Sequence, residues 1–290
     1  MIMFADELTR HQVWSMWKKV FGDSDEYMNI YFRDKYADEN TLLFMDGDKA
    51  VSSLQMLDYY FTFHGNEIPV YYLSGLCTLP EYRGRGYMKQ LILKSFEVAA
   101  ERKVPLVILV PQEEWLIDFY DKYGFVHTFE KSDAPLLSVK DILINNDGDL
   151  EKAYYEFDKH FNLSDMTVQK SFEDFLTIEE ELRLFGYPNV TNLTGMSRII
   201  DLEHLLMLFA NTYRDKEFDI NVEDEFIGSN SGFFRVNDGV VSKLSKQQGA
   251  DTINIRKITQ LLLGFNLEGE SEHFRAVFPQ KNPQMNMMLE

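Results

Sequence analysis

The 290-residue sequence contains a single cysteine, Cys77. One thiol can form neither an intrachain disulfide nor a zinc site built from several thiolates, so both kinds of framework are excluded. Long apolar runs are missing as well: the longest, residues 104–110, has strand length, whereas a membrane span needs ~18 apolar residues. The first residues also lack the basic-then-apolar order of a signal peptide. We therefore expect a soluble, cytoplasmic protein with no membrane partner.

Basic residues are scarce too, because 29 lysines and arginines are set against 47 aspartates and glutamates, for a net charge of −18. A nucleic-acid-binding protein needs a cationic surface to displace counterions from phosphate, so nucleic acid is not an expected partner. Acid-lined clefts concentrate cations, which favours a cationic small molecule or a basic peptide as ligand. Most surface charge serves solubility, so plain solvation is the alternative explanation. The association of copies of this chain is left open.

The composition is otherwise that of a globular protein, with 45% hydrophobic and 26% charged residues. Apolar periodicity over the first 132 residues predicts an α/β (α+β) fold in which a mixed sheet is flanked by helices. The expected helices are 8–21, 25–36, 87–102 and 115–123, and the expected strands are 41–45, 50–63, 68–78, 106–110 and 125–129.

The composition changes near residue 132. Residues 133–195 contain 13 acidic and five basic residues, with apolar positions that suggest short helices. The remainder predicts a second α+β unit, with helices at 199–213 and 255–263 and strands at 218–223, 232–236 and 240–244. We therefore predict three parts, 1–132, 133–195 and 196–290.

Residues 76–88 carry the strongest chemical signal, because a strand ends there, a loop with two glycines follows, and a helix begins. Glycine lets the backbone approach a ligand closely, and a helix N-terminus offers unpaired N–H groups to an anion such as pyrophosphate. Arg83 and Arg85 add positive charge. Taken alone, the unit is equally consistent with a tight connection whose arginines face solvent.

The spacing Arg83-x-x-Gly86 resembles the pyrophosphate-binding signature of the GCN5-related N-acetyltransferases (GNAT), whose fuller form is Arg/Gln-x-x-Gly-x-Gly/Ala. Met88 stands where many members have Gly or Ala. Residues 119–125, Phe-Tyr-Asp-Lys-Tyr-Gly-Phe, are similar to a second family marker, a helix that ends in an aromatic-Gly-Phe turn. The resemblance covers about residues 1–132 and implies that acetyl-CoA is the cosubstrate and that no metal is needed.

The resemblance also implies site residues. Tyr120 corresponds to the general acid that protonates the departing thiolate; its alternative role is packing. The expected coenzyme-binding residues comprise a strand end that meets the pantetheine arm and a loop that meets the pyrophosphate: Leu76, Cys77, Thr78, Arg83, Gly84, Arg85, Gly86, Tyr87 and Met88.

The last third resembles a sterol-carrier-protein-like domain at residues 197–201, 230–235 and 250–264. An acetyltransferase domain followed by such a domain is similar to the enhanced-intracellular-survival group. Members of that group generally insert a second, degenerate acetyltransferase-like domain in between. Residues 133–195 are too short for a complete one and are interpreted as its remnant, so the acceptor substrate is not carried over.

The signature strand also lacks the glutamate that many acetyltransferases use as base. In the enhanced-intracellular-survival group the terminal carboxylate takes that role, and this chain ends in an apolar segment with Met285, Met287 and Met288. We therefore hypothesise that the terminal carboxylate of Glu290 orients or deprotonates the acceptor. The alternative is a tail that is merely packed or disordered.

The expected function is direct, acetyl-CoA-dependent acetylation of a primary amine. The amine is expected to be cationic: an aminoglycoside-like compound, a polyamine or a lysine side chain. The competing interpretation is a non-catalytic protein that binds coenzyme A or lipid. Less favoured site residues are Cys77 as an acetylated nucleophile, His64 or His127 as a base, and Glu113 with Glu114 at the acceptor mouth.

Overall fold

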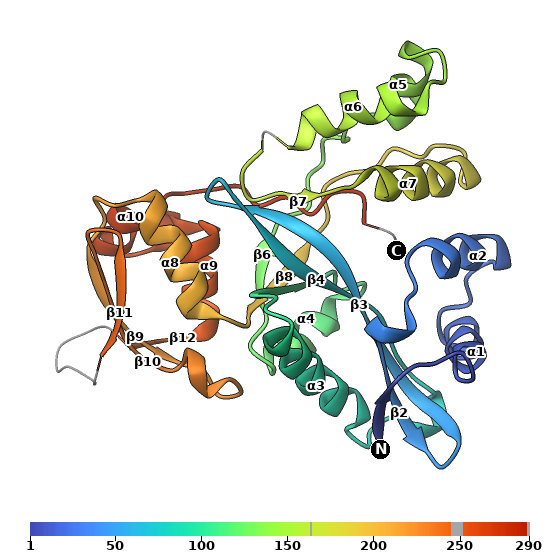
Figure 1. Cartoon of the computed structure of the whole chain (residues 1–290), viewed down its shortest axis with the longest axis horizontal. Coiled ribbons are helices and arrows are strands. Elements are labelled where there is room, and N and C mark those ends of the chain that lie inside the picture. The colour runs from blue at the N-terminus through green and yellow to red at the C-terminus, as the bar shows by residue number, and fades with distance from the viewer. Residues whose placement is uncertain (163, 245–251, 289–290) are drawn as a thin grey trace.

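The computed structural model describes residues 1–162, 164–244 and 252–288. Its largest element is an eight-stranded mixed sheet with the order β1-β2-β3-β4-β5-β8-β6, in which β7 pairs with the edge of β3 opposite β4 (Figure 1). The strands of this large sheet are β1 (Ile2–Phe4), β2 (Thr41–Asp46), β3 (Lys49–Phe63), β4 (Asn66–Thr78), β5 (Leu106–Leu109), β6 (Val126–Phe129), β7 (Val168–Gln169) and β8 (Gly195–Ile199). The helices around it are α1 (Arg10–Phe21), α2 (Asp25–Asp34), α3 (Tyr87–Glu101), α4 (Glu114–Asp121), α5 (Val139–Asn145), α6 (Leu150–Phe161) and α7 (Phe172–Leu184).

Two separate cores cover the two faces of the large sheet. Successive residues of a strand point to opposite faces, and the buried strand β5 shows this alternation. Val107 and Leu109 belong to the core under α3 and α4, whereas Leu106 and Ile108 belong to the core on the other face. That second face is covered by α1 and α2 at one end and by α9 (Ile255–Leu263) at the other. The predicted mixed sheet flanked by helices is confirmed.

The large sheet opens at the end of β4. Strands β4 and β5 pair in parallel only as far as Tyr72 and Ile108. Farther along, β4 contains one residue more than its partner β3, and Gly75 in this bulge has a φ of +59°. A Cβ atom on Gly75 would lie 2.6 Å from Cζ3 of Trp17, so only glycine fits here. The bulge and the splayed strands leave backbone groups of β4 free to meet a ligand.

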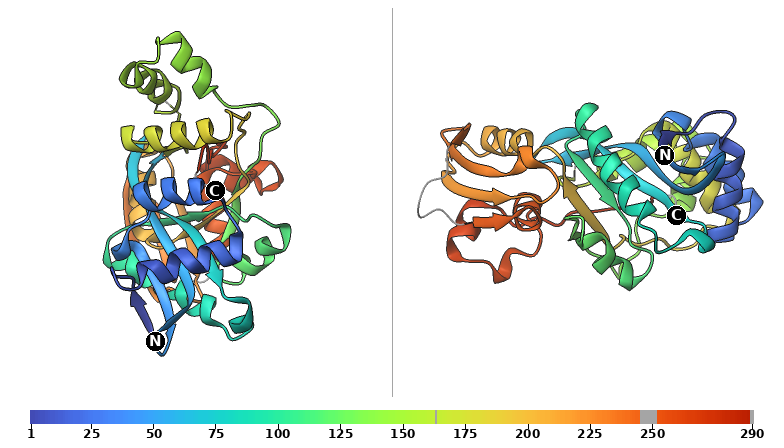
Figure 2. Two further views of the ribbon diagram at one scale, coloured as in Figure 1. Left: turned by 90° about the vertical axis from the view of Figure 1, so that its right-hand side faces the viewer. Right: turned by 90° about the horizontal axis from the view of Figure 1, so that it is seen from below.

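The acidic middle region, in which the sequence suggests short helices, contains the helices α5, α6 and α7. Helices α5 and α6 project away from the large sheet (Figures 1 and 2). Helix α7 packs against α2, where Arg33 forms a 2.6 Å ion pair with Glu180. Across the described ranges, no helix combines the length and the apolar character that crossing a membrane requires.

The last third forms a four-stranded sheet with the order β11-β10-β9-β12 and three helices (Figure 2). We call residues 201–277 the C-terminal unit. It lies at the end of the molecule opposite α1 and α2, and α9 packs on β6 and β8 of the large sheet. Its remaining elements are α8 (Leu202–Thr212), β9 (Phe218–Glu223), β10 (Gly232–Asn237), β11 (Val240–Leu244), β12 (Thr252–Asn254) and α10 (Glu272–Val277).

The predicted boundary between residues 195 and 196 is wrong, because it falls inside β8, which lies between β5 and β6 of the large sheet. The helix expected at 199–213 begins only at Leu202. All five residues of β8 are buried, so the strand lacks the polar alternation that would separate it from the following helix.

Beyond the C-terminal unit, the chain returns across the large sheet (Figure 1). Gln284 exchanges backbone hydrogen bonds with Met166 and Val168, and Leu193 N donates to Met285 O at 3.0 Å. Met288 then lies against the buried amine of Lys170, at 3.5 Å from Sδ to Nζ. The tail is therefore packed as far as this residue, which is compatible both with the Glu290 hypothesis and with a merely packed tail, whereas Glu290 itself lies outside the described residues.

Candidate active site

A cavity of about 500 Å³ lies at the open end of β4. We call it the larger cavity, because a smaller one adjoins it. Besides β4, helices α1 and α4 contribute to its walls, including the half-exposed Trp115. The structure thus brings all nine predicted coenzyme-binding residues together around one cavity: Leu76, Cys77, Thr78, Arg83, Gly84, Arg85, Gly86, Tyr87 and Met88.

The glycine loop has the backbone that the sequence motif requires. Gly84 and Gly86 have φ values of +76° and +74°, in the left-handed region that other residues rarely adopt. Gly86 is the N-cap of α3, and a Cβ atom there would meet no atom within 4 Å. The first N–H groups of α3 therefore border the larger cavity without side chains in the way, an arrangement suited to a phosphate anion.

A second, smaller cavity of about 200 Å³ adjoins the larger one. It is lined by side chains from α1, β4 and α4, among them Trp17, Tyr72 and Ser74. Both cavities are bordered by the same five residues, Phe21, Leu76, Gln112, Leu116 and Tyr120. The two spaces therefore meet at Leu76 on the β4 bulge and at Tyr120 on α4.

Tyr120 is buried at this junction, with 5% of its surface exposed. Burial raises the pKa of its phenol above the ordinary value, since a phenolate would be poorly solvated there. The phenol therefore keeps its proton at neutral pH, as a general acid must.

Asp23 is the only charged side chain among the described residues that line the smaller cavity. Helix α1 ends at Gly22 and Ser24 caps α2, so Asp23 lies in the connection between the two helices. The indole Nε1 of Trp17 donates a 2.6 Å hydrogen bond to its Oδ2. Asp23 is not among the site residues that the sequence predicts. The missed signal is a carboxylate beside the N-cap Ser24, six residues after a tryptophan.

The alternative catalytic residues are placed differently. Cys77 lines the larger cavity, but burial raises the pKa of its thiol to about 11, so it is a poor nucleophile at neutral pH. His64 is buried against the C-terminal unit, where its Nε2 donates to Leu262 O at 2.8 Å, and His127 Nε2 donates to Phe129 O at 2.9 Å. Glu113 borders the larger, coenzyme-side cavity and accepts from Trp115 Nε1 at 2.6 Å, whereas Glu114 is not among the lining residues.

Residues 3–128 match the family model of the acetyltransferase (GNAT) domain. The chain therefore carries a GNAT acetyltransferase domain. The match includes the glycine loop, the signature strand and Tyr120, and it accounts for the sheet that opens at β4. No curated protein matches the sequence.

Solved structures extend the likeness to the whole chain. A GCN5-related N-acetyltransferase from Kribbella flavida has a TM-score of 0.68 at 13% identity, covering 98% of this chain and 96% of its own. Eis1 from Mycobacterium abscessus has a TM-score of 0.66 at 15% identity, covering 99% of both chains. A probable N-acyltransferase from Enterococcus faecalis V583 has a TM-score of 0.67 at 14% identity, covering 99% and 98%. These likenesses are in the fold, and they fit the resemblance to the enhanced-intracellular-survival group. The sterol-carrier-like nature of the C-terminal unit stays a prediction.

Proposed function

We propose that this protein transfers an acetyl group directly from acetyl-CoA to a primary amine. The observation that carries the proposal is that two adjoining cavities meet at Tyr120 and Leu76. Donor and acceptor can then be bound at the same time, with a proton donor where they react.

Coenzyme A fits the larger cavity by its chemistry. The pantetheine arm is an amide-containing chain that can pair with the edge of β4 beyond Tyr72, where β5 no longer does. The pyrophosphate would meet the first N–H groups of α3, with the charges of Arg83 and Arg85 nearby. A backbone N–H of the β4 bulge would polarise the thioester oxygen, a contribution of roughly 3 kcal/mol in comparable oxyanion sites.

The reaction then needs only the groups at the junction. The amine nitrogen attacks the thioester carbonyl carbon and forms a tetrahedral intermediate. Collapse of that intermediate breaks the C–S bond, and the Tyr120 phenol donates its proton to the departing thiolate. The proton lost by the amine passes to a base, so the products are an amide and free coenzyme A.

Two carboxylates serve the acceptor in this proposal. Asp23, held by Trp17, attracts the cationic amine into the smaller cavity. The Glu290 terminal carboxylate orients or deprotonates the amine, which the docked path of the tail as far as Met288 supports. An α-carboxyl has a reference pKa near ~3.5, so it needs partial burial or a water relay to deprotonate an ammonium of pKa near ~10.

The proposed acceptors are an aminoglycoside-like compound, a polyamine or a lysine side chain. The test is release of free thiol from acetyl-CoA in the presence of one representative of each class. The proposal expects amine-dependent thiol release with at least one of them. Coenzyme binding without release for all three would support a non-catalytic binding protein instead.

A further inference from the structure

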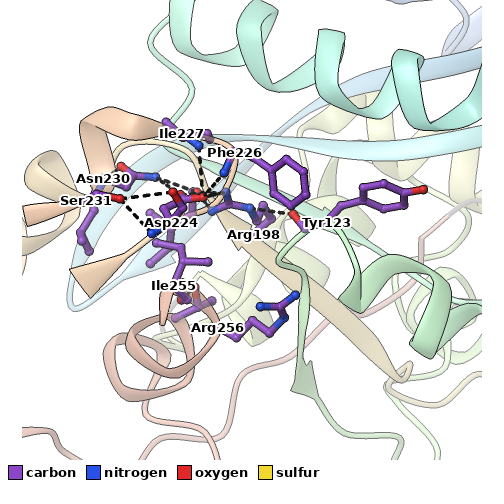
Figure 3. Close-up of polar contacts among 12 residues, drawn as sticks. Tyr123, Arg198, Asp224, Phe226, Ile227, Asn230, Ser231, Ile255 and Arg256 are labelled. Carbon is purple, nitrogen blue, oxygen red and sulfur yellow. Dashed lines mark hydrogen bonds and ion pairs between the residues drawn. The ribbon is translucent and has the colours of Figure 1, made fainter. Parts of the chain in front are cut away.

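Two arginines hold the C-terminal end of α4, the helix that carries Tyr120, and Figure 3 shows the contact of one of them, Arg198, with Tyr123. Arg256, at the start of α9 in the C-terminal unit, donates from Nε to Asp121 O at 3.0 Å and forms a 2.9 Å ion pair with Asp121 Oδ1. Arg198 on β8 donates from Nε to Tyr123 O at 3.1 Å. The two carbonyl groups belong to the last residue of the helix and to the turn that follows it, one and three residues after Tyr120.

The C-terminal unit also fixes the position of Arg198. The guanidinium of Arg198 is fully buried and donates from Nη2 to both carboxylate oxygens of Asp224, at 2.7 and 2.8 Å. Asp224 in turn accepts from the backbone N–H groups of Phe226 and Ile227 and from Asn230 Nδ2, all within 3.1 Å (Figure 3). Because every one of these groups is bonded, the buried ion pair is a stiff connection between the C-terminal unit and α4.

The turn after α4 is shaped around this arginine. Gly124 has a φ of +83°, and a Cβ atom there would lie 2.8 Å from Nε of Arg198. The glycine of the aromatic-Gly-Phe turn therefore makes room for the guanidinium. The aromatic-Gly-Phe turn of the acetyltransferase domain thus accommodates Arg198, which lies about 75 residues farther along the chain.

We propose that the C-terminal unit positions Tyr120, through Arg256 and through the Arg198–Asp224 pair. This inference rests on the proposed function, in which Tyr120 is the acid. An isolated eight-residue helix is not stable on its own, so its end contacts decide where it lies. A displacement of about 1 Å at a reacting group can lower a rate up to about 10²-fold. Arg256 and Arg198 are accordingly positioning residues, and a change in the C-terminal unit alters acetyl transfer.

The test uses Arg256→Gln, because Arg256 is partly exposed and its loss leaves the buried pair intact. The matched control is Lys257→Gln, the next residue of α9, which loses an ion pair to Glu270 within the C-terminal unit. We expect Arg256→Gln to lower kcat about tenfold, with little change in the KM for acetyl-CoA, and Arg256→Lys to recover part of the loss. Lys257→Gln should leave kcat unchanged.

Combination with Tyr120→Phe then shows whether Arg256 acts through the phenol. If it does, Arg256→Gln causes no further loss in the Tyr120→Phe background. If the loss of kcat in the double variant equals the product of the losses in the two single variants, the proposal is overturned. Equal kcat for the Arg256→Gln and Lys257→Gln variants would overturn it as well. Amide hydrogen exchange is an independent readout: exchange in residues 118–123 should become faster in Arg256→Gln and not in Lys257→Gln. Unchanged exchange also overturns positioning, whereas absence of turnover in the unmodified protein rejects only the proposed function.

Discussion

The indole of Trp17 fixes the carboxylate of Asp23 at the wall of the smaller cavity, through a 2.6 Å hydrogen bond to Oδ2. The two residues belong to successive parts of a helix–turn–helix segment, and Ser24 caps the second helix in place of Asp23. Asp23 is therefore free of a capping role and brings negative charge to the space where an acceptor would bind.

Asp23→Asn tests that role. The amide keeps an oxygen that can accept from Trp17 Nε1, but it loses the charge. We expect the KM for a cationic amine to rise about tenfold, equivalent to about 1.4 kcal/mol, while the affinity for acetyl-CoA stays unchanged. Steady-state kinetics with both substrates varied measures the two effects separately. An unchanged KM for the amine would remove Asp23 from acceptor binding.

Gly86→Val tests the phosphate loop. Valine is strained at a φ of +74°, at a position that borders the larger cavity. The matched control is Gly148→Val, at a φ of +77° with equally open surroundings but between α5 and α6. Both variants should lose about 1–2 kcal/mol of stability, and only Gly86→Val should bind acetyl-CoA more weakly in calorimetric titration. Equal affinity in both variants contradicts the assignment.

Tyr120→Phe keeps the ring and removes the proton. Turnover should fall by about 10²-fold, while coenzyme affinity holds. Burial raises the pKa of the phenol, so Tyr120 should stay protonated as the pH rises from 6 to about 10. Ionisation of Tyr120 should therefore not lower the rate of the unmodified protein in this range. The pH–rate profile, measured beside that of the variant, checks both statements. Full activity of Tyr120→Phe would exclude the phenol as the acid.

The proposed role of the Glu290 carboxylate is tested by extending the chain. A short C-terminal extension moves the carboxylate away, whereas an equal N-terminal extension leaves it in place. We expect slower amine acetylation only from the C-terminally extended protein. Equal rates for the two proteins would refute the proposal.

His64 links the β3–β4 hairpin to the C-terminal unit and makes stability depend on pH. Burial lowers its pKa from 6.5 to about 4, and its Nδ1 must stay unprotonated to accept from the Tyr213 hydroxyl at 3.1 Å. The unfolded chain therefore binds the proton more readily, and stability should fall by up to about 3 kcal/mol as the pH is lowered from 6.5 to 4. Urea unfolding at several pH values across this window gives the free energy of unfolding as a function of pH. This free energy should fall less steeply with decreasing pH in His64→Gln than in the unmodified protein. An equal pH dependence of the free energy of unfolding in both proteins would mean that His64 does not cause the loss of stability.

Much of the fold is predictable because local patterns decide it. The bounds of β9, β11 and α9 agree with the expected segments, and the coenzyme residues fall together because a strand, loop and helix place them within 13 positions. Two features depend on contacts distant in sequence. Strand β8 is buried on both faces and lacks alternation, and the Arg198–Asp224 pair joins elements whose register only the packed structure sets.

The central claim is direct transfer between two substrates bound together at Tyr120. Initial rates of thiol release, measured while acetyl-CoA and a cationic amine are both varied, test it most directly. Transfer in a ternary complex predicts double-reciprocal lines that intersect, with no thiol release when the amine is omitted. Parallel lines would indicate an acetylated enzyme and contradict the account, as would thiol release that does not depend on the amine.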